Sequence, residues 1–205
     1  MQEKRRPSLG VKHKLFEIAN SQEGFFTSKQ AIEAGVNKRN FFYHVNAGNW
    51  IKEGHGIYRL ANYPQSAQAQ YIPIWLWTRN KQGIPEGAFS HETALSIWGL
   101  SDLMPSKIHI SVAKNFRRSS HPPSEVILHK EQNLYVTKSG VVDVVNALQA
   151  LTQVYEAETQ SRDIVAQGFN QAVARGLIHH LDFDRVPMKE GTRAFFDGLR
   201  MRSAS

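Results

Sequence analysis

The stretch that decides the fold runs from Asn37 to Gly48 and reads Asn-Lys-Arg-Asn-Phe-Phe-Tyr-His-Val-Asn-Ala-Gly. At about 100° per residue, a helix would gather its apolar side chains on one side and its polar ones on the other. Asn37 suits an N-cap, because its side chain can accept from a free backbone N–H, and Gly48 suits the left-handed residue that ends a helix. We expect Phe41, Phe42 and Val45 on the core side and Arg39, Asn40, Tyr43 and Ala47 on the free side.

Two helices are expected before this stretch. Residues 11–20 carry apolar side chains at approximate helical spacing, and Thr27 is a suitable N-cap for a helix that continues to Ala34. In the second helix, Ala31 and Ile32 are expected to face inward. Phe25-Phe26, between the two helices, is a short apolar link that either pairs as a strand or simply enters the core.

A hairpin is expected after it. Residues 50–60 are two alternating runs on either side of Gly54-His55-Gly56, a pattern typical of two antiparallel strands. Two short helices joined by a Gly-containing turn and followed by a hairpin predict a winged helix-turn-helix domain, whose second helix of the pair enters the DNA major groove.

Charge favours the same partner. The chain of 205 residues has a formal net charge of +7, and residues 1–63 contain 10 Lys and Arg against 5 Asp and Glu. Lys and Arg bind phosphates with release of counterions, so this excess predicts a polyanion partner, although a membrane surface would attract the same charge. The predicted DNA-contacting residues are Ser28, Lys29, Lys38, Arg39, Asn40, Tyr43, His44, Lys52, His55 and Arg59.

Composition excludes several classes of protein. The chain has no cysteine, so disulfides, thiolate catalysis and thiolate metal sites are excluded. No apolar run approaches the roughly 20 residues that span a bilayer, and the first residues lack the apolar core of a signal peptide. We therefore expect a cytoplasmic protein with no membrane contact.

The predicted fold class is α+β, with a winged helix-turn-helix domain at residues 1–63 and a larger mixed domain at residues 64–205. Residues 1–9 are expected to form a flexible basic arm. In the second domain, a buried helix over Tyr71–Trp77 tolerates Pro73 in its first turn. The other expected helices are 90–98, 137–151, 161–175 and 191–201, and the expected strands are 107–112, 126–128 and 134–136.

Several segments carry a family resemblance. Phe26-Thr27-Ser28-Lys29-Gln30-Ala31, Ala34-Gly35-Val36 and Gly54–Leu60 resemble the winged-helix domain of AbiEi-type antitoxins. Phe89-Ser90-His91-Glu92-Thr93-Ala94-Leu95, Gly99-Leu100-Ser101-Asp102 and residues 105–112 are similar to the start of that family's C-terminal domain. The resemblance covers roughly residues 10–150.

This resemblance implies a transcriptional autoregulator that binds inverted repeats in its own promoter. It also implies antagonism of a nucleotidyltransferase-like toxin without a stable complex, and a monomer or weak dimer that pairs on DNA. Neither a cofactor nor an enzymatic activity is expected.

The histidine, serine and acidic residues of the chain do not match known catalytic or metal-binding motifs. His91, His109, His129 and His179-His180 lack a recognised ligand spacing, and neighbouring Ser90 and His91 would point about 100° apart on a helix, so no metal site or catalytic pair is expected. A nuclease fused to the winged helix is the main alternative, and its signature is an Asp followed by a Glu-x-Lys pair on a strand. Glu125-Val126-Ile127 and Asp143-Val144-Val145 both lack the lysine at the required position. An interaction module that keeps a winged helix without binding DNA is a third possibility.

Overall fold

A computed structural model describes residues 9–100 and 105–203. The chain is α+β, as predicted, and it divides into two compact units, Met1–Pro85 and Glu86–Ser205. The division falls after Pro85, whereas the sequence placed the domain boundary at residue 63. The expected arm, apart from Leu9, and the Ser101-Asp102 pair of the second motif lie outside the described residues.

The first unit places a small sheet between helices. Within the described residues its strand order is β1-β3-β2, with both pairings antiparallel. In chain order its elements are α1 Leu9–Asn20, β1 Phe25–Thr27, α2 Ser28–Glu33, the 3-10 turn η1 Lys38–Asn40, α3 Phe41–Asn46, β2 Trp50–Gly54, β3 Ile57–Leu60, η2 Ala69–Tyr71 and α4 Ile72–Trp77.

One face of this sheet packs against α1, α2 and α3. Phe26 pairs across the strands with Tyr58, and its ring centroid lies 4.8 Å from that of Trp50. Leu15 of α1 and Phe41 of α3 join the same buried cluster. Because neighbouring side chains on a strand point to opposite faces, Phe26 and Trp50 hold the three helices on one side. The predicted link Phe25-Phe26 is therefore a paired strand.

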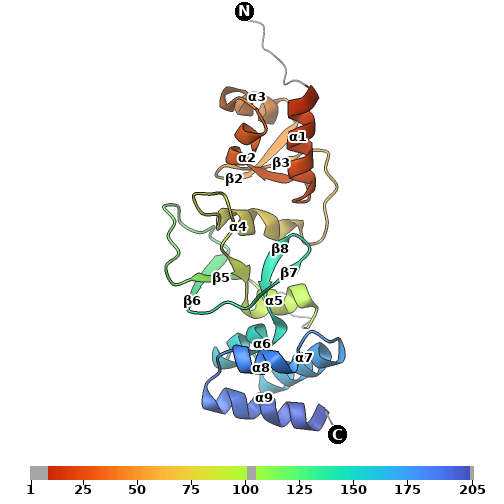
Figure 1. The fold of residues 1–205 in the computed structure, drawn as a ribbon, viewed down its shortest axis with the longest axis vertical. Coiled ribbons are helices and arrows are strands. Elements are labelled where there is room, and N and C mark those ends of the chain that lie inside the picture. The colour runs from red at the N-terminus through yellow and green to blue at the C-terminus, as the bar shows by residue number, and fades with distance from the viewer. Residues whose placement is uncertain (1–8, 101–104, 204–205) are drawn as a thin grey trace, which may run out of the picture. The chain divides into compact units, whose positions relative to one another are not determined.

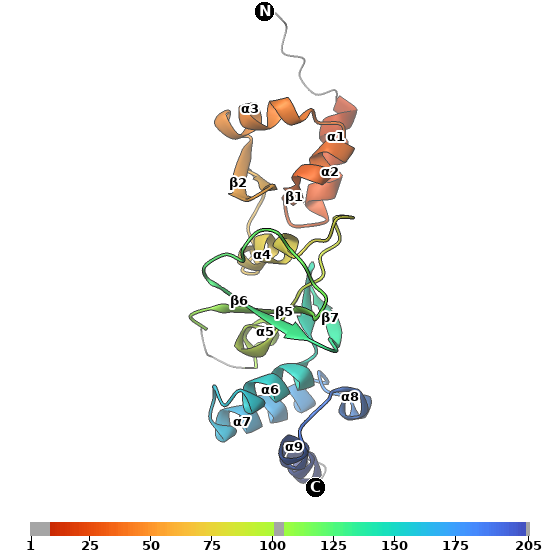
Figure 2. The same cartoon turned by 90° about the vertical axis from the view of Figure 1, so that its left-hand side faces the viewer.

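The other face of the sheet is covered by α4. Phe25 and Ile57 alternate with the residues of the first core and are themselves buried, and α4 contacts all three strands. Figures 1 and 2 show α4 and α3 on opposite sides of the strands. As predicted, Pro73 stands in the first turn of α4, where its missing N–H leaves no helical bond unmade.

Three helix-capping residues predicted from the sequence, at positions 27, 37 and 48, have the expected geometry. The Thr27 side chain accepts from the Gln30 N–H, and the Gln30 side chain accepts from the Thr27 N–H, which completes a capping box. The Asn37 side chain accepts from the Arg39 N–H, and Gly48 has the left-handed φ of 70°. These signals fix the start of α2, the entry into α3 and the turn into β2.

The second unit is a five-stranded mixed sheet with a group of helices. Within the described residues the strand order is β6-β5-β4-β8-β7, and Figures 1 and 2 place α5 between these strands and α6. Its elements are β4 Ala88–Phe89, α5 His91–Trp98, β5 Ile108–Ala113, β6 Val126–Glu131, β7 Val136–Ser139, β8 Val142–Val145, α6 Ala147–Glu156, α7 Arg162–Ala174, α8 His180–Arg185 and α9 Glu190–Ser203.

One predicted helix is wrong at its start. Thr137 does not cap a helix but lies in β7, which pairs with β8 around a turn at Gly140, where φ is 58°. The helix begins at Ala147 after Asn146, whose side chain accepts from the Gln149 N–H. Val142 and Val144 are buried on either side of the half-buried Asp143, and this alternation favours a strand over the helix that was expected there.

Among the described residues, the structure has no helix that is both long enough and apolar enough to cross a membrane.

Candidate nucleic-acid interface

Two residues of α3 lie on different sides from those expected. Phe42 is 75% exposed, although the sequence placed it in the core, and His44 is only 8% exposed, although it was expected to contact DNA. Phe41 is buried and Val45 packs against the same core. The positions that face the core are thus i, i+3 and i+4, the usual set for a helix, and Phe42 lies about 100° away.

His44 occupies a core position because Trp50 provides a partner for its ring. The two rings are stacked, with centroids 4.5 Å apart and an interplanar angle of 18°. Its Nε2 is buried and has no hydrogen-bond partner among the described residues. Burial, and then the charge of Lys12, lower the pKa of His44 below its usual 6.5. His44 is therefore a neutral anchor of α3.

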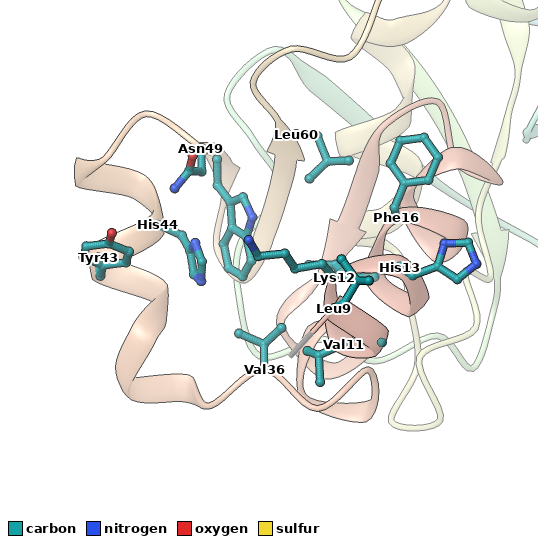
Figure 3. Close-up of a pocket in the computed structure, with 13 residues that line it drawn as sticks. Leu9, Val11, Lys12, His13, Phe16, Val36, Tyr43, His44, Asn49 and Leu60 are labelled. Atoms are coloured by element: carbon teal, nitrogen blue, oxygen red, sulfur yellow. The ribbon is translucent and has the colours of Figure 1, made fainter. Parts of the chain in front are cut away.

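A pocket of about 890 Å³ lies beside this anchor. Figure 3 shows His44 and Tyr43 on α3 at one side, and Lys12, His13 and Phe16 on α1 at the other. Val36 and Leu60 complete part of its lining. Because the pocket separates parts of α1 and α3, Phe41, His44 and Trp50 provide much of the contact that positions α3.

The remaining side chains of this segment form an outward surface, which we call the α3 face: Lys38, Arg39, Phe42 and Tyr43. All four are exposed. Lys52 and His55 of the hairpin are exposed as well. The chain has no acidic residue between Glu33 and Glu53, a span that contains three Lys and Arg residues. Positive charge here is not offset by carboxylates in the same segment, which suits a polyanion.

Other predicted contact residues have structural partners. Lys29 Nζ donates to the backbone oxygens of Lys81 at 3.1 Å and Gln82 at 2.6 Å. Arg59 Nε donates to Glu53 Oε1 at 2.8 Å, and its guanidinium lies 5.9 Å from the centroid of the Phe25 ring. Both cations therefore have partners within the first unit. Arg59 is also half-buried, whereas Lys29 remains exposed.

The two polar residues at helix starts are half-buried. The Ser28 N–H donates to the Gly56 oxygen at 2.9 Å, which joins α2 to the hairpin turn. Asn40 lies at the junction between η1 and α3, and its N–H donates to the Asn37 oxygen at 2.8 Å. Of the ten predicted DNA contacts, six are exposed: Lys29, Lys38, Arg39, Tyr43, Lys52 and His55. Among these six, Lys29 already donates to two backbone oxygens of the first unit.

Sequence reasoning missed Phe42 as a surface residue. Two adjacent phenylalanines are both expected in a core, and the signal that could have separated them is the position of His44. A core face built on Phe41 includes the residues three and four positions later, which leaves Phe42 outside. Polarity scales do not indicate that His44 faces the core, because they treat histidine as a surface residue.

Comparison with known proteins establishes the fold and no more. No protein-family model matches the chain, and no curated protein matches it. Among solved structures, the crystal structure of the RV2827C protein from Mycobacterium tuberculosis is similar, with a TM-score of 0.57 and 13% sequence identity. The match covers 99% of this chain and 80% of that chain. At this identity, the similarity is one of fold.

Proposed function

We propose that the chain is a sequence-specific DNA-binding regulator, and that the α3 face enters the major groove. The observation that carries the proposal is that α3 is held from behind by Phe41 and His44 while Arg39, Phe42 and Tyr43 are exposed. A helix fixed on one side can present side chains to base edges at defined positions, which direct readout requires.

The order of elements supports the same proposal. Residues 34–37 form a short turn between α2 and η1, and the hairpin β2–β3 follows α3 directly. This is the order expected of a winged helix-turn-helix domain, in which the turn sets the angle between the two helices. Lys52 and His55 on the hairpin are then suited to phosphate or minor-groove contact.

Three residues of the α3 face have distinct proposed roles. Arg39 is suited to bidentate donation to guanine, and Phe42 to apolar contact with a thymine methyl group. Lys38, near the start of the segment, is suited to phosphate contact, which positions the protein without reading sequence. The proposed partner is double-stranded DNA.

The test is selection of binding sites from random double-stranded DNA by the full chain, followed by titration of the enriched site. Arg39→Ala should weaken binding to that site by roughly 5- to 150-fold and relax selectivity at one base pair, the range expected for loss of one bidentate contact. Lys38→Ala should weaken all sequences about equally and reduce the salt slope by about 1. The matched control is Lys130→Ala, which removes an exposed cation from β6.

Two results would contradict this function. If no sequence is enriched, the chain is better described as an interaction module that has kept the fold. If a site is enriched but Arg39→Ala and Phe42→Ala leave both affinity and selectivity unchanged, another surface reads the DNA.

The regulatory role is proposed on the resemblance to AbiEi-type antitoxins. It comprises repression of the chain's own promoter through inverted repeats and antagonism of a nucleotidyltransferase-like toxin. The chain should protect inverted repeats upstream of its own gene in a footprinting assay, and co-expression should relieve toxicity of an adjacent nucleotidyltransferase-like gene product. Absence of both effects would leave DNA binding without this role.

The nuclease alternative gains no support from the positions of its two candidate acids. Glu125 precedes β6, while Asp143 lies in β8, and β5 and β4 stand between these strands in the sheet. Asp143 Oδ1 also pairs with Lys138 Nζ at 2.8 Å. Magnesium-dependent cleavage of the enriched site would favour this alternative over the regulator.

A further inference from the structure

The first turn of α5 covers a polar face of two neighbouring strands. β5 and β6 are parallel and paired with His109 opposite Ile127 and Ser111 opposite His129. Because side chains alternate along a strand, His109, Ser111 and His129 share one face. The N-terminal turn of α5 meets this face, and the His109 N–H donates to Thr93 Oγ1 at 2.9 Å.

Three imidazoles converge where these elements meet. His109 Nδ1 lies 3.0 Å from His129 Nε2, and the ring of His91 is stacked on that of His129 with centroids 3.8 Å apart. One ring nitrogen from each of the three lies within 4.8 Å of the other two. Ligands of a tetrahedral zinc ion at about 2.0–2.1 Å are roughly 3.4 Å apart, so the three nitrogens are already near one another, and the stacked rings would have to rotate apart to point them at one ion.

Two polar side chains are placed to orient these rings. Ser90 Oγ lies 3.0 Å from His91 Nδ1, which leaves His91 Nε2 for another partner. The sequence expectation that these neighbours point apart was wrong, because Ser90 is an extended residue before the helix. Glu92 Oε2 lies 3.7 Å from His109 Nε2, on the opposite edge of the ring from the Nδ1 that faces His129. Imidazole ligands of metals commonly donate their second N–H to a carboxylate or hydroxyl in this way.

The cluster contains buried polar atoms without partners. Glu92 is 7% exposed, and its Oε2 has no hydrogen-bond partner among the described residues. The same holds for the buried Oγ of Ser111, which shares the strand face with His109 and His129. Burying unpaired polar atoms is costly, and a carboxylate far more so than a hydroxyl. A cation at the three imidazoles would offset the unpaired negative charge of Glu92.

The backbone at His91 is also unusual. Its φ is 51°, in the left-handed region that few residues other than glycine adopt, at a cost of about 1–3 kcal/mol. The His91 N–H donates to Gln153 Oε1 at 3.3 Å, a contact with α6 that helps to hold this conformation. His91 and Gln153 both line an open pocket of about 540 Å³, which offers an ion a path to the cluster.

We propose that His91 Nε2, His109 Nδ1 and His129 Nε2 bind one Zn²⁺ ion. Ser90 and Glu92 orient the rings of His91 and His109, and the fourth position opens toward the pocket beside His91. Imidazole nitrogens favour zinc among the abundant divalent cations, whereas magnesium and calcium prefer sites built from oxygen. The ion would join α5, β5 and β6, and this site is independent of the proposed DNA contact.

The experiment is a competition titration of the untagged, chelator-treated full chain with Zn²⁺ and a chromophoric chelator. One ion per chain is expected, with a higher unfolding temperature in excess zinc because the ion binds the folded state. His91→Asn should weaken zinc binding at least 100-fold while keeping the fold, since asparagine tolerates a positive φ. Glu92→Gln should weaken it by about 10- to 100-fold, the usual effect of removing an orienting partner.

The matched control is His180→Asn, an exposed histidine of α8, which should bind zinc like the original chain. A second measurement needs no variant. On addition of Zn²⁺, the ring resonances of His91, His109 and His129 should shift together in NMR spectra, because the stack must open. Failure to bind one ion more tightly than about 10 µM, equal affinity in a folded His91→Asn variant, or ring shifts confined to other histidines would each overturn the proposal.

Discussion

The α3 face and the histidine cluster both include polar side chains near the start of a short helix, but they differ in exposure. Lys38, Arg39 and Tyr43 are exposed to solvent, whereas His91 and Glu92 are buried against two strands. In the first case an apolar core on the far side of the helix keeps the polar residues outward. In the second case polar residues themselves form the packed layer.

This difference separates two kinds of functional surface. Exposed polar residues are hydrated by solvent, so leaving them without a partner costs the folded state little free energy. The fold itself therefore does not require a partner. Buried polar residues need hydrogen bonds or a counter-charge within the fold, and unpaired atoms mark where something is lacking. The first surface is therefore inferred from shape and charge, and the second from incomplete bonding.

The largest expected effect tests the boundary between the exposed face and the core of α3. Phe41→Ala should destabilise the first unit by about 3–5 kcal/mol, because it leaves a cavity in the core beside Trp50. Phe42→Ala, one residue later, should change stability by less than about 0.5 kcal/mol. Denaturant unfolding followed by hydrogen exchange in residues 9–60 measures both. Equal losses for the two variants would mean that the exposed face of α3 is misassigned.

Effects of intermediate size are expected at the histidine cluster, measured in the presence of chelator. One substitution there should destabilise the second unit and another should stabilise it. Thr93→Val should destabilise the second unit by about 1–3 kcal/mol, because the His109 N–H would lose its acceptor. Ser111→Ala should stabilise it by about 1 kcal/mol, because the removed hydroxyl is buried and has no partner among the described residues. Hydrogen exchange of the β5 amides reports both changes. A destabilising Ser111→Ala would show that this hydroxyl is bonded after all.

The smallest effect concerns His44, a buried histidine in the otherwise apolar anchor of α3. Its pKa is lower in the folded chain than the usual 6.5 of the unfolded chain, so the unfolded state binds more protons as pH falls. The contribution of His44 to stability is complete above pH 6.5 and is lost as pH falls toward its folded pKa. His44→Phe removes this titration. As pH falls from 7.5 to 5.5, the free energy of unfolding of the variant should therefore rise relative to that of the original chain. Denaturant unfolding at the two pH values would show no such change if His44 is protonated equally in both states.

Sequence reasoning located most of the fold because its strongest signals are local. The Thr27 capping box, the Asn37 cap, Gly48 and the alternation of residues 50–60 each act within a few residues and need no tertiary partner. The start of α6 was missed because valines near residue 142 are compatible with either a helix or a strand. Only pairing with β7 separates the two.

The candidate sites were harder to predict because they depend on tertiary contacts. Stacking on Trp50 buried His44 and thereby turned Phe42 outward. Bonds to a distant turn and to a cross-strand acid engaged Lys29 and Arg59. His91, His109 and His129 lie on one helix and two strands, about 20 residues apart, so no short ligand motif exists. Their convergence depends on the register of β5 with β6, which sequence patterns do not specify.

Because α4 covers one face of the small sheet, it determines which fragment of this chain could fold independently or be fused to another protein. A fragment cut at residue 63 would leave Phe25 and Ile57 open to water on the face that α4 covers, and it would also lose the backbone oxygens of Lys81 and Gln82 that hold Lys29. Such a fragment would be prone to aggregation, because a solvent-exposed apolar sheet face promotes association with other molecules. A fragment that ends at Pro85 retains both, so the separable unit is about twenty residues longer than its first three helices and hairpin suggest.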